Sequence, residues 1–367
     1  MQIDFANLQH QHNLYKEEIE EAILKVARDC NFIMGSQIDE LERNLEKFTG
    51  SKYAISCSSG TDALLLAMMA LDIQPDDEII TTPFTFFATA ETIAFLKAKP
   101  VFVDIDEQTY NIDPKKIEEK ISSKTKAIIP VSLYGQPCDM DEINQIAKKY
   151  NLKVIVDGAQ SFGSTYKGIS DSNLGDISCT SFFPAKPLGC YGDGGALFTN
   201  DEKLADKIKS LRLHGQSIRY HHQYIGMGGR LDTIQAAVLN VKLKYYEKDL
   251  KLRQDVADKY TKALNAKNIE TPFVKNDRTS AWAQYSIRVQ NRTELQTKLQ
   301  NLGIPTAVHY PMPLHVQECF KYLNLKEGDF PISEKVSKEI MSLPMNPYVT
   351  DEEIEFIVGS LAKELKC

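Results

Sequence analysis

Short apolar runs that alternate with amphipathic helical stretches constrain the fold of this chain more than any other feature. The clearest runs are Tyr53–Ser56, Glu78–Thr81, Pro100–Asp104, Ala127–Pro130, Val154–Val156 and Ile177–Phe182. Continuous apolar strands separated by helices indicate a mainly parallel sheet that is covered on both faces. We therefore predict an α/β fold whose ligands bind at the carboxyl ends of the strands.

The remainder of the chain predicts a second, smaller domain. A helical pattern rich in Lys and Leu, from about Leu231 to Ala266, leads out of the sheet domain. Beyond it, strands are expected around Trp282–Val289 and helices at Arg292–Leu302 and Asp351–Leu365. The predicted division is a large domain with the N-terminal segment (1–240), then the linking helix and a small α+β domain (241–367).

Lys186 is the lysine that the sequence singles out as a catalytic residue. It lies between the aromatic pair Phe182–Phe183 and the glycine-rich turn 192–195, and its nearest neighbours are uncharged. A lysine placed against apolar groups loses hydration and its pKa falls, which leaves a free amine for imine formation with an aldehyde or ketone. The alternative, common for an isolated lysine, is that its stem packs on Phe182 or Phe183.

A phosphate-binding helix start is predicted at Ser58–Ala67, where small capping residues directly precede an Ala/Leu run. The free backbone N–H groups and the positive end of the helix dipole at such a position attract a phosphate. An ordinary N-cap accounts equally well for Ser59 and Thr61.

Two further segments place groups that could bind a flat ring at strand ends. Val154–Gln160 is a buried strand that ends in Asp157, whose carboxylate could pair with a pyridine nitrogen or simply cap the next helix. Pro83–Thr89 puts aromatic residues at a strand-to-helix junction, where one ring could stack on a cofactor or pack in the core. Combined with the helix start and Lys186, these groups predict a pyridoxal phosphate (PLP) site.

Composition and motifs argue against several other classes of protein. The net charge of −7 gives no reason to expect nucleic acid or an anionic membrane as a partner. The seven cysteines are scattered without CxxC spacing, which is typical of reduced thiols and not of a disulfide framework or a metal site. With no signal peptide and no run long enough for a membrane span, a cytoplasmic protein is expected. No Gly-x-Gly-x-x-Gly follows a strand, which argues against a dinucleotide-binding fold.

The order and spacing of these segments resemble the sugar-nucleotide aminotransferases of the DegT/DnrJ/EryC1/StrS family, which are fold-type I PLP enzymes. The likeness runs through nearly the whole chain and includes Ile3–Asp4, Gly60–Leu64, Tyr134–Gly135, Asp157–Gln160, Gly229–Ala237 and His309–Pro311. Within the family, the chain looks most similar to the enzymes that aminate UDP-2-acetamido-2-deoxy-3-oxo-glucuronate. The stretches that carry this closer likeness are Ile129–Gln136, Lys186–Gly195 and His214–His222.

The resemblance implies a role for each residue at a matching position. Lys186 would link to the cofactor and carry a proton, Asp157 would pair with the ring nitrogen, and Gln160 would reach the ring oxygen. The residues expected to bind the cofactor are Gly60, Thr61, Asp62, Phe86, Asp157, Gln160, Ser181 and Lys186. No metal is implied.

A second set of positions falls where the family contacts the sugar nucleotide. These residues are Phe32, Arg230, His309 and Tyr310. A uronic acid adds a carboxylate to two phosphates, so local cations are needed, and the candidates are Arg230, His309 and the stretch 219–222.

The resemblance also implies glutamate as the amino donor and a homodimer with shared active sites, in which the loop 220–230 crosses to the partner. Gly228 departs from the family, since an asparagine from the neighbouring subunit usually stands there. Alternative substrates are dTDP- or UDP-linked 6-deoxy sugars with a 3- or 4-keto group. A non-transaminating homologue is a further alternative, but related dehydratases replace the lysine that this chain retains as Lys186.

Overall fold

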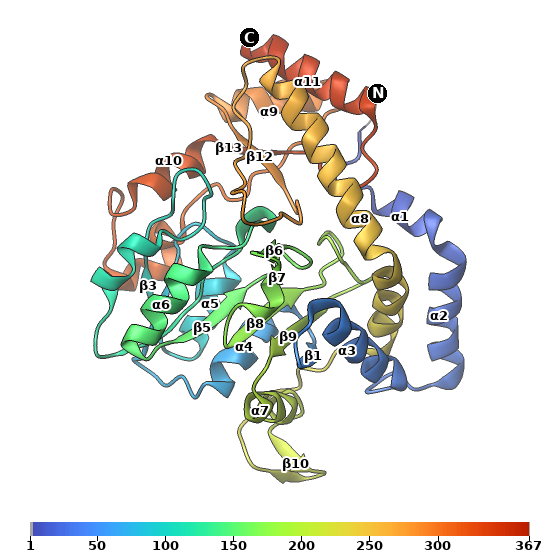
Figure 1. The fold of residues 1–367 in the computed structure, drawn as a ribbon, viewed down its shortest axis with the longest axis vertical. Helices are drawn as coiled ribbons and strands as arrows, with labels where there is room; N and C mark the ends of the chain where they lie inside the picture. Colours follow the sequence, from blue (N-terminus) through green and yellow to red (C-terminus); the bar gives the residue numbers. More distant parts are fainter. Residues whose placement is uncertain (1–2, 367) are drawn as a thin grey trace.

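The computed structural model describes residues 3–366, and a seven-stranded sheet forms the centre of this part of the chain (Figure 1). The strands are β1 (Tyr53–Cys57), β2 (Glu78–Thr81), β3 (Lys99–Phe102), β4 (Thr125–Ile128), β5 (Lys153–Asp157), β8 (Ile177–Ser181) and β9 (Gly195–Thr199), in the order β1-β9-β8-β5-β4-β2-β3. Neighbouring strands from β8 to β3 are parallel, whereas β9 is antiparallel to both β1 and β8. The predicted mainly parallel sheet is confirmed, but β9 was not among the predicted strands.

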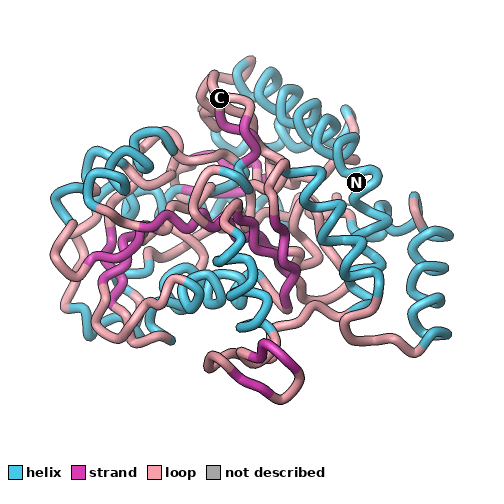
Figure 2. The backbone as a smooth tube through the Cα atoms, turned by 60° about the horizontal axis from the view of Figure 1, so that its bottom comes forward, coloured by secondary structure: helices cyan, strands magenta, loops and turns pink. Residues whose placement is uncertain are grey.

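Helices flank this twisted sheet (Figure 2). The helices that precede α8 in the sequence are α1 (Leu8–Leu14), α2 (Lys16–Asp29), α3 (Ser36–Thr49), α4 (Gly60–Ala70), α5 (Ala88–Phe95), α6 (Met140–Tyr150) and α7 (Glu202–Arg212). Helix α4 is the most deeply placed of them, since Leu66, Ala67 and Met68 are all fully buried. Burial of an almost entirely apolar helix fixes its N-terminus firmly beside the strand ends, where the predicted phosphate site lies.

A second core forms at the other end of the molecule. Its elements are β12 (Tyr285–Arg288), β13 (Ile340–Leu343), α9 (Arg292–Asn301) and α11 (Asp351–Leu365), with β12 and β13 paired antiparallel. Helix α10 (Pro331–Glu339) packs instead beside the large sheet, where its Val336 joins the cluster that contains Phe84. The terminal helix α11 has the predicted limits and begins with a capping box between Thr350 and Glu353. Ile3 belongs to this second core, so the start of the described chain packs with residues from its other end.

The long helix α8 (Thr233–Asn265) connects the two cores (Figure 1). Tyr246 packs among the apolar residues of the sheet domain, whereas Tyr260 and Leu264 are buried in the second core. The predicted boundary between residues 240 and 241 falls inside this helix. The division into two domains stays a prediction.

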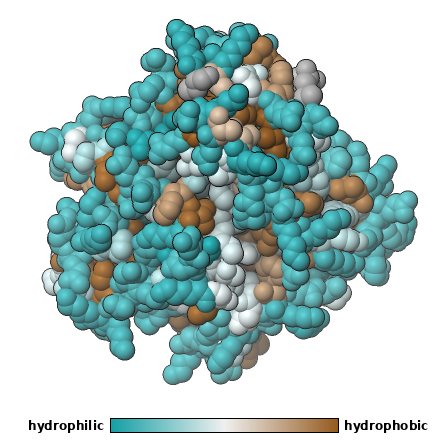
Figure 3. Space-filling model, turned by 45° about the horizontal axis from the view of Figure 1, so that its top comes forward, coloured by the Kyte–Doolittle hydropathy of each residue, from teal (hydrophilic) through white to brown (hydrophobic). Residues whose placement is uncertain are grey.

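A small hairpin extends beyond α7 at the edge of the molecule (Figures 1 and 2). Its strands β10 (Gln216–Ile218) and β11 (His221–His222) pair antiparallel, and the side chains of Ile218 and Tyr220 are 71% and 77% exposed. The face in Figure 3 is otherwise mainly hydrophilic with scattered apolar patches. Across residues 3–366, no helix combines the length and apolar character needed to cross a membrane.

Candidate active site

Asp157 stands at the carboxyl end of β5 with its carboxylate buried. Thr89 Oγ1 donates to Asp157 Oδ2 at 2.7 Å, while Oδ1 receives only a longer bond, 3.3 Å, from the Ala159 N–H. Burial raises the pKa of the Asp157 carboxyl, and these hydrogen bonds and the charge of Lys186 oppose that rise. Oδ1 is therefore the oxygen with capacity for another donor. The sequence prediction did not include Thr89, although its spacing of four from Thr85 places both on one side of the turn into α5.

Lys186 lies in the tight loop between β8 and β9. The loop folds back on itself, because the Lys186 N–H donates to the Phe183 carbonyl. The backbone is also close to itself at Gly189, where an added Cβ would lie only 2.4 Å from the Pro184 carbonyl oxygen. Burial lowers the pKa of the Lys186 amine, and the negative charge of Asp157 partly offsets the effect. The structure thus brings Lys186 and Asp157 within electrostatic range, although 29 positions separate them in the sequence.

Phe86, Gln160 and Tyr310 form one wall of the same site. Gln160 Nε2 donates to the Tyr310 hydroxyl at 3.1 Å, and Gln160 Oε1 accepts from the Tyr134 N–H at 2.7 Å. The Phe86 ring lies 6.0 Å from the Tyr310 ring and is 55% exposed. An exposed ring beside a fixed amide leaves one aromatic face open to a flat ligand.

The N-terminus of α4 is built as an anion site. Ser59 caps the helix by accepting from the Asp62 N–H at 3.0 Å, and the Asp62 carboxylate accepts from the hydroxyls of Ser58 and Ser59 at 2.5 and 3.0 Å. The N–H groups of Gly60 and Thr61 have no hydrogen-bond partner among residues 3–366. These two amides, and not that of Asp62, are free to bind a phosphate.

Ser181, which the resemblance implies as a phosphate contact, lies against this helix start. A Cβ added to Gly60 would come within 2.6 Å of Ser181 Cβ and 3.1 Å of Ser181 Oγ. A Cβ on Gly195, at the end of the Lys186 loop, would meet the Ser59 carbonyl oxygen at 2.4 Å. The lysine loop and the helix start therefore pack closely, and only glycine fits at either contact.

Arg230 and Phe32 lie near the site but do not reach Lys186 within one chain. The Ser58 N–H donates to the Gly229 carbonyl at 3.0 Å, which holds the half-buried Arg230 next to the helix start. Its guanidinium has neither a hydrogen bond nor an ion pair within residues 3–366. Phe32 is 46% exposed, and its carbonyl accepts from the Thr233 N–H at 3.0 Å at the start of α8.

Comparison with known proteins places this geometry in a family. The family model described as the DegT/DnrJ/EryC1/StrS aminotransferase family matches residues 13–362. The chain belongs to this family. The UDP-2-acetamido-2-deoxy-3-oxo-D-glucuronate aminotransferase of Pseudomonas aeruginosa is 50% identical over 359 residues, which cover 98% of this chain and 99% of that protein. The dTDP-3-amino-3,6-dideoxy-alpha-D-galactopyranose transaminase of Aneurinibacillus thermoaerophilus is 42% identical over 98% of both chains.

Two solved structures match the fold along the whole of this chain. A DegT/DnrJ/EryC1/StrS aminotransferase from Brucella abortus has a TM-score of 0.96 and 38% identity, with 100% of both chains covered. The structure of ntda from Bacillus subtilis with bound cofactor PMP has a TM-score of 0.93 and 32% identity, covering 100% of this chain and 86% of that one. The predictions of the family, the fold, an aminotransferase and a PLP-type cofactor are confirmed.

The site of this aminotransferase fits PLP by its own geometry. Two free amides at a helix start, with glycine where a side chain would collide, suit a phosphate. A buried carboxylate with a free oxygen suits a ring nitrogen, and a lysine with a lowered pKa suits the aldehyde. When bound, the cofactor supplies an electron sink for the amino-transfer chemistry.

His309 is not a cation in this aminotransferase, contrary to the expectation that it could meet a substrate carboxylate. Its burial, together with the positive charge of Lys186, lowers its pKa to about 4, so the imidazole is neutral at pH 7. His309 Nδ1 is engaged by Ser342 Oγ at 2.8 Å. The second group of expected cations, around Arg219, lies on the projecting hairpin, and Arg219 and His222 bond only to neighbouring hairpin groups in the described chain. Of the three candidates, Arg230 alone is an unpaired cation beside the helix start.

Lys242 is a second buried lysine that the sequence prediction missed. It lies on α8 with its Nζ donating to the Gly189 carbonyl at 2.7 Å and 4.7 Å from the centre of the Tyr191 ring. Burial lowers the Lys242 pKa to about 8. Its spacing of four from the buried Val238 and Tyr246 was the signal that could have placed it on the inner face of the helix. The hydrogen bond from Lys242 supports the loop that carries Lys186, and Lys242 has no hydrogen bond to Asp157 in the described chain.

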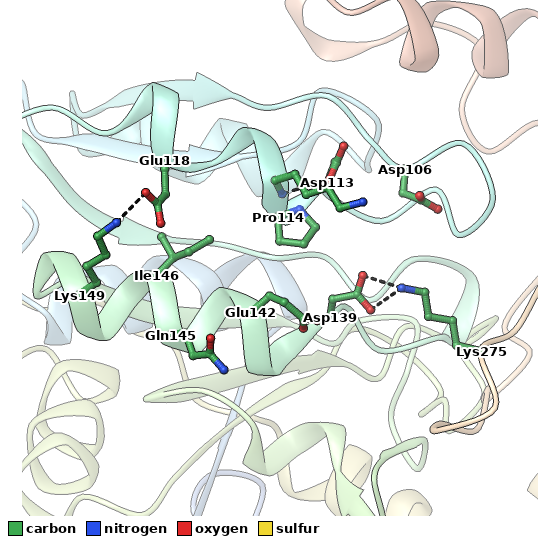
Figure 4. A pocket seen from close by; sticks show the side chains of 11 residues that line it. Asp106, Asp113, Pro114, Glu118, Asp139, Glu142, Gln145, Ile146, Lys149 and Lys275 are labelled. Carbon is green, nitrogen blue, oxygen red and sulfur yellow. Dashed lines mark hydrogen bonds and ion pairs between the residues drawn. The ribbon is translucent and has the colours of Figure 1, made fainter.

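A groove of about 690 Å³ between α6 and the segment 113–118 contains none of the predicted site residues (Figure 4). Glu118 pairs with Lys149 and Asp139 with Lys275, each at 2.8 Å. The charged residues that line the groove are Asp106, Asp113, Glu118, Asp139, Glu142, Lys115, Lys149 and Lys275. An excess of carboxylates does not suit a nucleoside diphosphate.

Proposed function

We propose that this aminotransferase uses PLP to transfer an amino group to the 3-keto group of UDP-2-acetamido-2-deoxy-3-oxo-glucuronate. The observation that carries the proposal is the 50% identity to the P. aeruginosa enzyme of that name along nearly the full length of both chains. Arg230 supports it from the structure, because a half-buried guanidinium without an ion partner in the described chain can bind the substrate carboxylate through two parallel hydrogen bonds.

Three residues of the site have different chemical roles: Lys186 supplies an amine, Asp157 a carboxylate and Gln160 an amide. Burial lowers the pKa of the Lys186 amine, which favours its unprotonated form, and the amine can then accept or return a proton during transfer. Asp157 is held by Thr89 with Oδ1 left free to balance a positive ring nitrogen. Gln160 is fixed from both ends, by Tyr134 and Tyr310, so its amide can select one tilt of the ring.

The remaining predicted contacts complete this proposal. Gly60, Thr61 and Ser181 bind the cofactor phosphate, and Phe86 stacks on the ring. Phe32, Arg230, His309 and Tyr310 contact the sugar nucleotide. Glutamate is the amino donor, as the resemblance implies. The cytoplasm is the location, which the scattered cysteines without disulfide or metal spacing support. The spore coat polysaccharide biosynthesis protein SpsC of Bacillus subtilis is 36% identical, which supports a role in making a surface polysaccharide such as an O-antigen or lipopolysaccharide.

A 6-deoxy keto-sugar nucleotide is the second candidate substrate. It is favoured by the 42% identity to the A. thermoaerophilus dTDP-sugar transaminase. The two candidates differ at one group, since a methyl replaces the carboxylate, and Arg230 discriminates between them only if it binds that group.

A substrate panel tests the proposal. The protein is loaded with PMP and offered the UDP-linked 3-keto uronate, its 6-deoxy counterpart and a dTDP-linked 3-keto-6-deoxy sugar, while the absorbance near about 410 nm reports the return of the PLP form. We expect the uronate to give the highest kcat/KM by about tenfold or more, since its carboxylate gains a charge-assisted pair. A faster reaction with either 6-deoxy sugar would establish the second candidate instead.

Arg230→Lys should weaken the uronate reaction selectively. Lysine keeps the charge but cannot make two parallel hydrogen bonds. The kcat/KM for the uronate should therefore fall, with a loss of about 1–3 kcal/mol in transition-state stabilisation. The 6-deoxy substrate should lose far less. Equal losses for both substrates would mean that Arg230 only supports the local structure, and would remove it from the substrate site.

We also propose that the enzyme is a homodimer in which each chain completes the site of the other. The projecting hairpin exposes Ile218 and Tyr220, and Ile225, which follows it, is 93% exposed. Such apolar exposure on a loop that stands off the body is typical of a surface covered in an assembly. Sedimentation at working concentration should show a dimer, and full activity in a monomeric species would refute the shared site.

A further inference from the structure

Two buried threonine hydroxyls lie in line behind Asp157. Thr85 Oγ1 is 3.0 Å from Thr89 Oγ1, and Thr89 Oγ1 is 2.7 Å from Asp157 Oδ2. All three residues are buried, so water does not compete for these groups. Neither hydroxyl has a further hydrogen bond within residues 3–366. We call this chain of hydrogen bonds, from Thr85 through Thr89 to Asp157, the threonine relay.

The relay uses every one of its hydrogens when Asp157 is ionised. A carboxylate oxygen only accepts, so the single hydroxyl hydrogen of Thr89 points at Asp157 Oδ2. Thr89 Oγ1 is then the acceptor for Thr85, whose only hydroxyl hydrogen is used in that bond. The other carboxylate oxygen, Oδ1, accepts from the Ala159 N–H at 3.3 Å. Each of these donors therefore has an acceptor.

A protonated Asp157 fits the same contacts less well. A hydrogen on Oδ2 would point at Thr89 and turn the Thr89 hydrogen toward Thr85. The buried hydroxyl hydrogen of Thr85 would then have no acceptor in the described chain, which costs free energy. A hydrogen on Oδ1 would make that oxygen a weaker acceptor for the Ala159 N–H. The contacts therefore favour the carboxylate.

The relay opposes the effect of burial on Asp157. Burial raises the pKa of this carboxyl, and the hydrogen bond from Thr89 is the largest of the effects that lower it again. Thr85 does not touch Asp157. It acts through Thr89, because its hydrogen occupies the Thr89 oxygen and leaves Asp157 as the acceptor for the Thr89 hydrogen.

We infer that Thr85 and Thr89 are positioning residues that hold Asp157 as a carboxylate and leave Oδ1 as the oxygen available to the pyridine nitrogen of the cofactor. The inference rests on the role proposed for Asp157. An anionic Asp157 keeps that ring nitrogen protonated, which is the state in which the cofactor withdraws electrons. Thr89 acts directly on Oδ2, and Thr85 acts one bond further away by fixing the direction of the Thr89 hydroxyl.

The protonation of the ring nitrogen can be read by 15N NMR of the protein loaded with PLP that is labelled at this nitrogen, with no sugar or amino donor present. We expect a protonated nitrogen in the unmodified protein. Thr89→Val keeps nearly the same shape but removes the hydroxyl, so the signal should move toward the unprotonated form. The kcat should fall by about tenfold, the size expected for losing one hydrogen bond to a charged group. Thr89→Ser keeps the hydroxyl and should behave like the unmodified protein.

Thr85→Val tests the outer member of the relay. Asp157 keeps its hydrogen bond from Thr89 in this variant, but the direction of the Thr89 hydroxyl is no longer fixed. We therefore expect a smaller movement of the 15N signal than in Thr89→Val, and a fall in kcat of about threefold.

Thr92→Val is the matched control for both variants. Thr92 is fully buried on the same helix, α5, and its hydroxyl donates to the Ala88 carbonyl at 2.9 Å. The substitution removes a buried threonine hydroxyl without touching Asp157, so it should change neither the 15N signal nor kcat.

A ring nitrogen that stays fully protonated in Thr89→Val would overturn the inference, as would an equal movement of the signal in Thr92→Val. If Thr89→Val does not fold, the comparison of Thr85→Val with Thr92→Val decides in the same way. Failure of the proposed function looks different. A protonated nitrogen in Asp157→Asn would refute the role of Asp157 itself, and a uronate that does not react in the substrate panel would leave the NMR result standing.

Discussion

Lys186→Ala is expected to abolish amino transfer, with kcat lowered by about a thousandfold or more, and to leave the fold intact. Among residues 3–366, Lys242 is the only other lysine with a pKa lowered by burial, and it cannot replace Lys186 because its amine is committed to the Gly189 carbonyl. The substitution removes one half-buried side chain from a loop held by backbone contacts. Circular dichroism and melting temperature should be close to those of the unmodified protein.

Two further lysine variants test whether the loss of activity comes specifically from the Lys186 amine. Lys186→Arg keeps a cation but not a nucleophilic amine, so it should be as inactive as Lys186→Ala. Lys242→Met should lower the melting temperature, since it breaks the brace behind the loop, yet keep the visible band and kcat within about tenfold. Borohydride should bleach the band of the unmodified and Lys242→Met proteins only. Turnover by Lys186→Ala within about tenfold of the unmodified enzyme would refute the assignment.

Asp157→Asn is expected to lower kcat by about a hundredfold while the cofactor stays bound. The neutral amide cannot balance a positive ring nitrogen, although it keeps the shape and can still accept from Thr89. Because the phosphate contacts at Gly60 and Thr61 are untouched, the dissociation constant of PLP, measured by fluorescence titration, should change much less than kcat.

Asp249→Asn is the matched control for this change. Asp249 is a buried carboxylate on α8, 2% exposed, that accepts from Gln11 and lies outside the proposed site. Its substitution should affect stability and spare kcat. If Asp157→Asn instead retained the kcat of the unmodified enzyme, Asp157 would be only a cap at the end of β5, which is the alternative that its sequence position also allowed.

The sequence predicted the elements that have a strong apolar signal and missed those without one. Glu78–Thr81 and Asp351–Leu365 were predicted with their observed limits, because a short apolar run and a capped amphipathic pattern have clear ends. Strand β9 was missed because its first residue, Gly195, closes a glycine-rich turn. Helix α2 was not predicted either, although Ile19, Ile23 and Val26 recur at helical spacing in its sequence.

At the site, the sequence indicated which residue types take part but not their electrostatic state. His309 was counted among possible cations because nothing in its neighbours shows that tertiary packing buries it and makes it neutral. The Asp62 carboxylate points to Ser58 and Ser59, which leaves other amides for the phosphate. Charge and hydrogen-bond partners depend on residues far apart in the chain, as with Ser342, whose Oγ lies 2.8 Å from His309 Nδ1.

Helix α8 has a consequence for how the protein unfolds. Because one uninterrupted helix supplies Tyr246 to the first core and Tyr260 to the second, loosening either core withdraws support from a helix that the other needs. Ile3 adds a second connection, since the start of the described chain is anchored in the core that forms from its end. We therefore expect the two cores to unfold together in one cooperative transition, in which the site around Lys186 is lost as well.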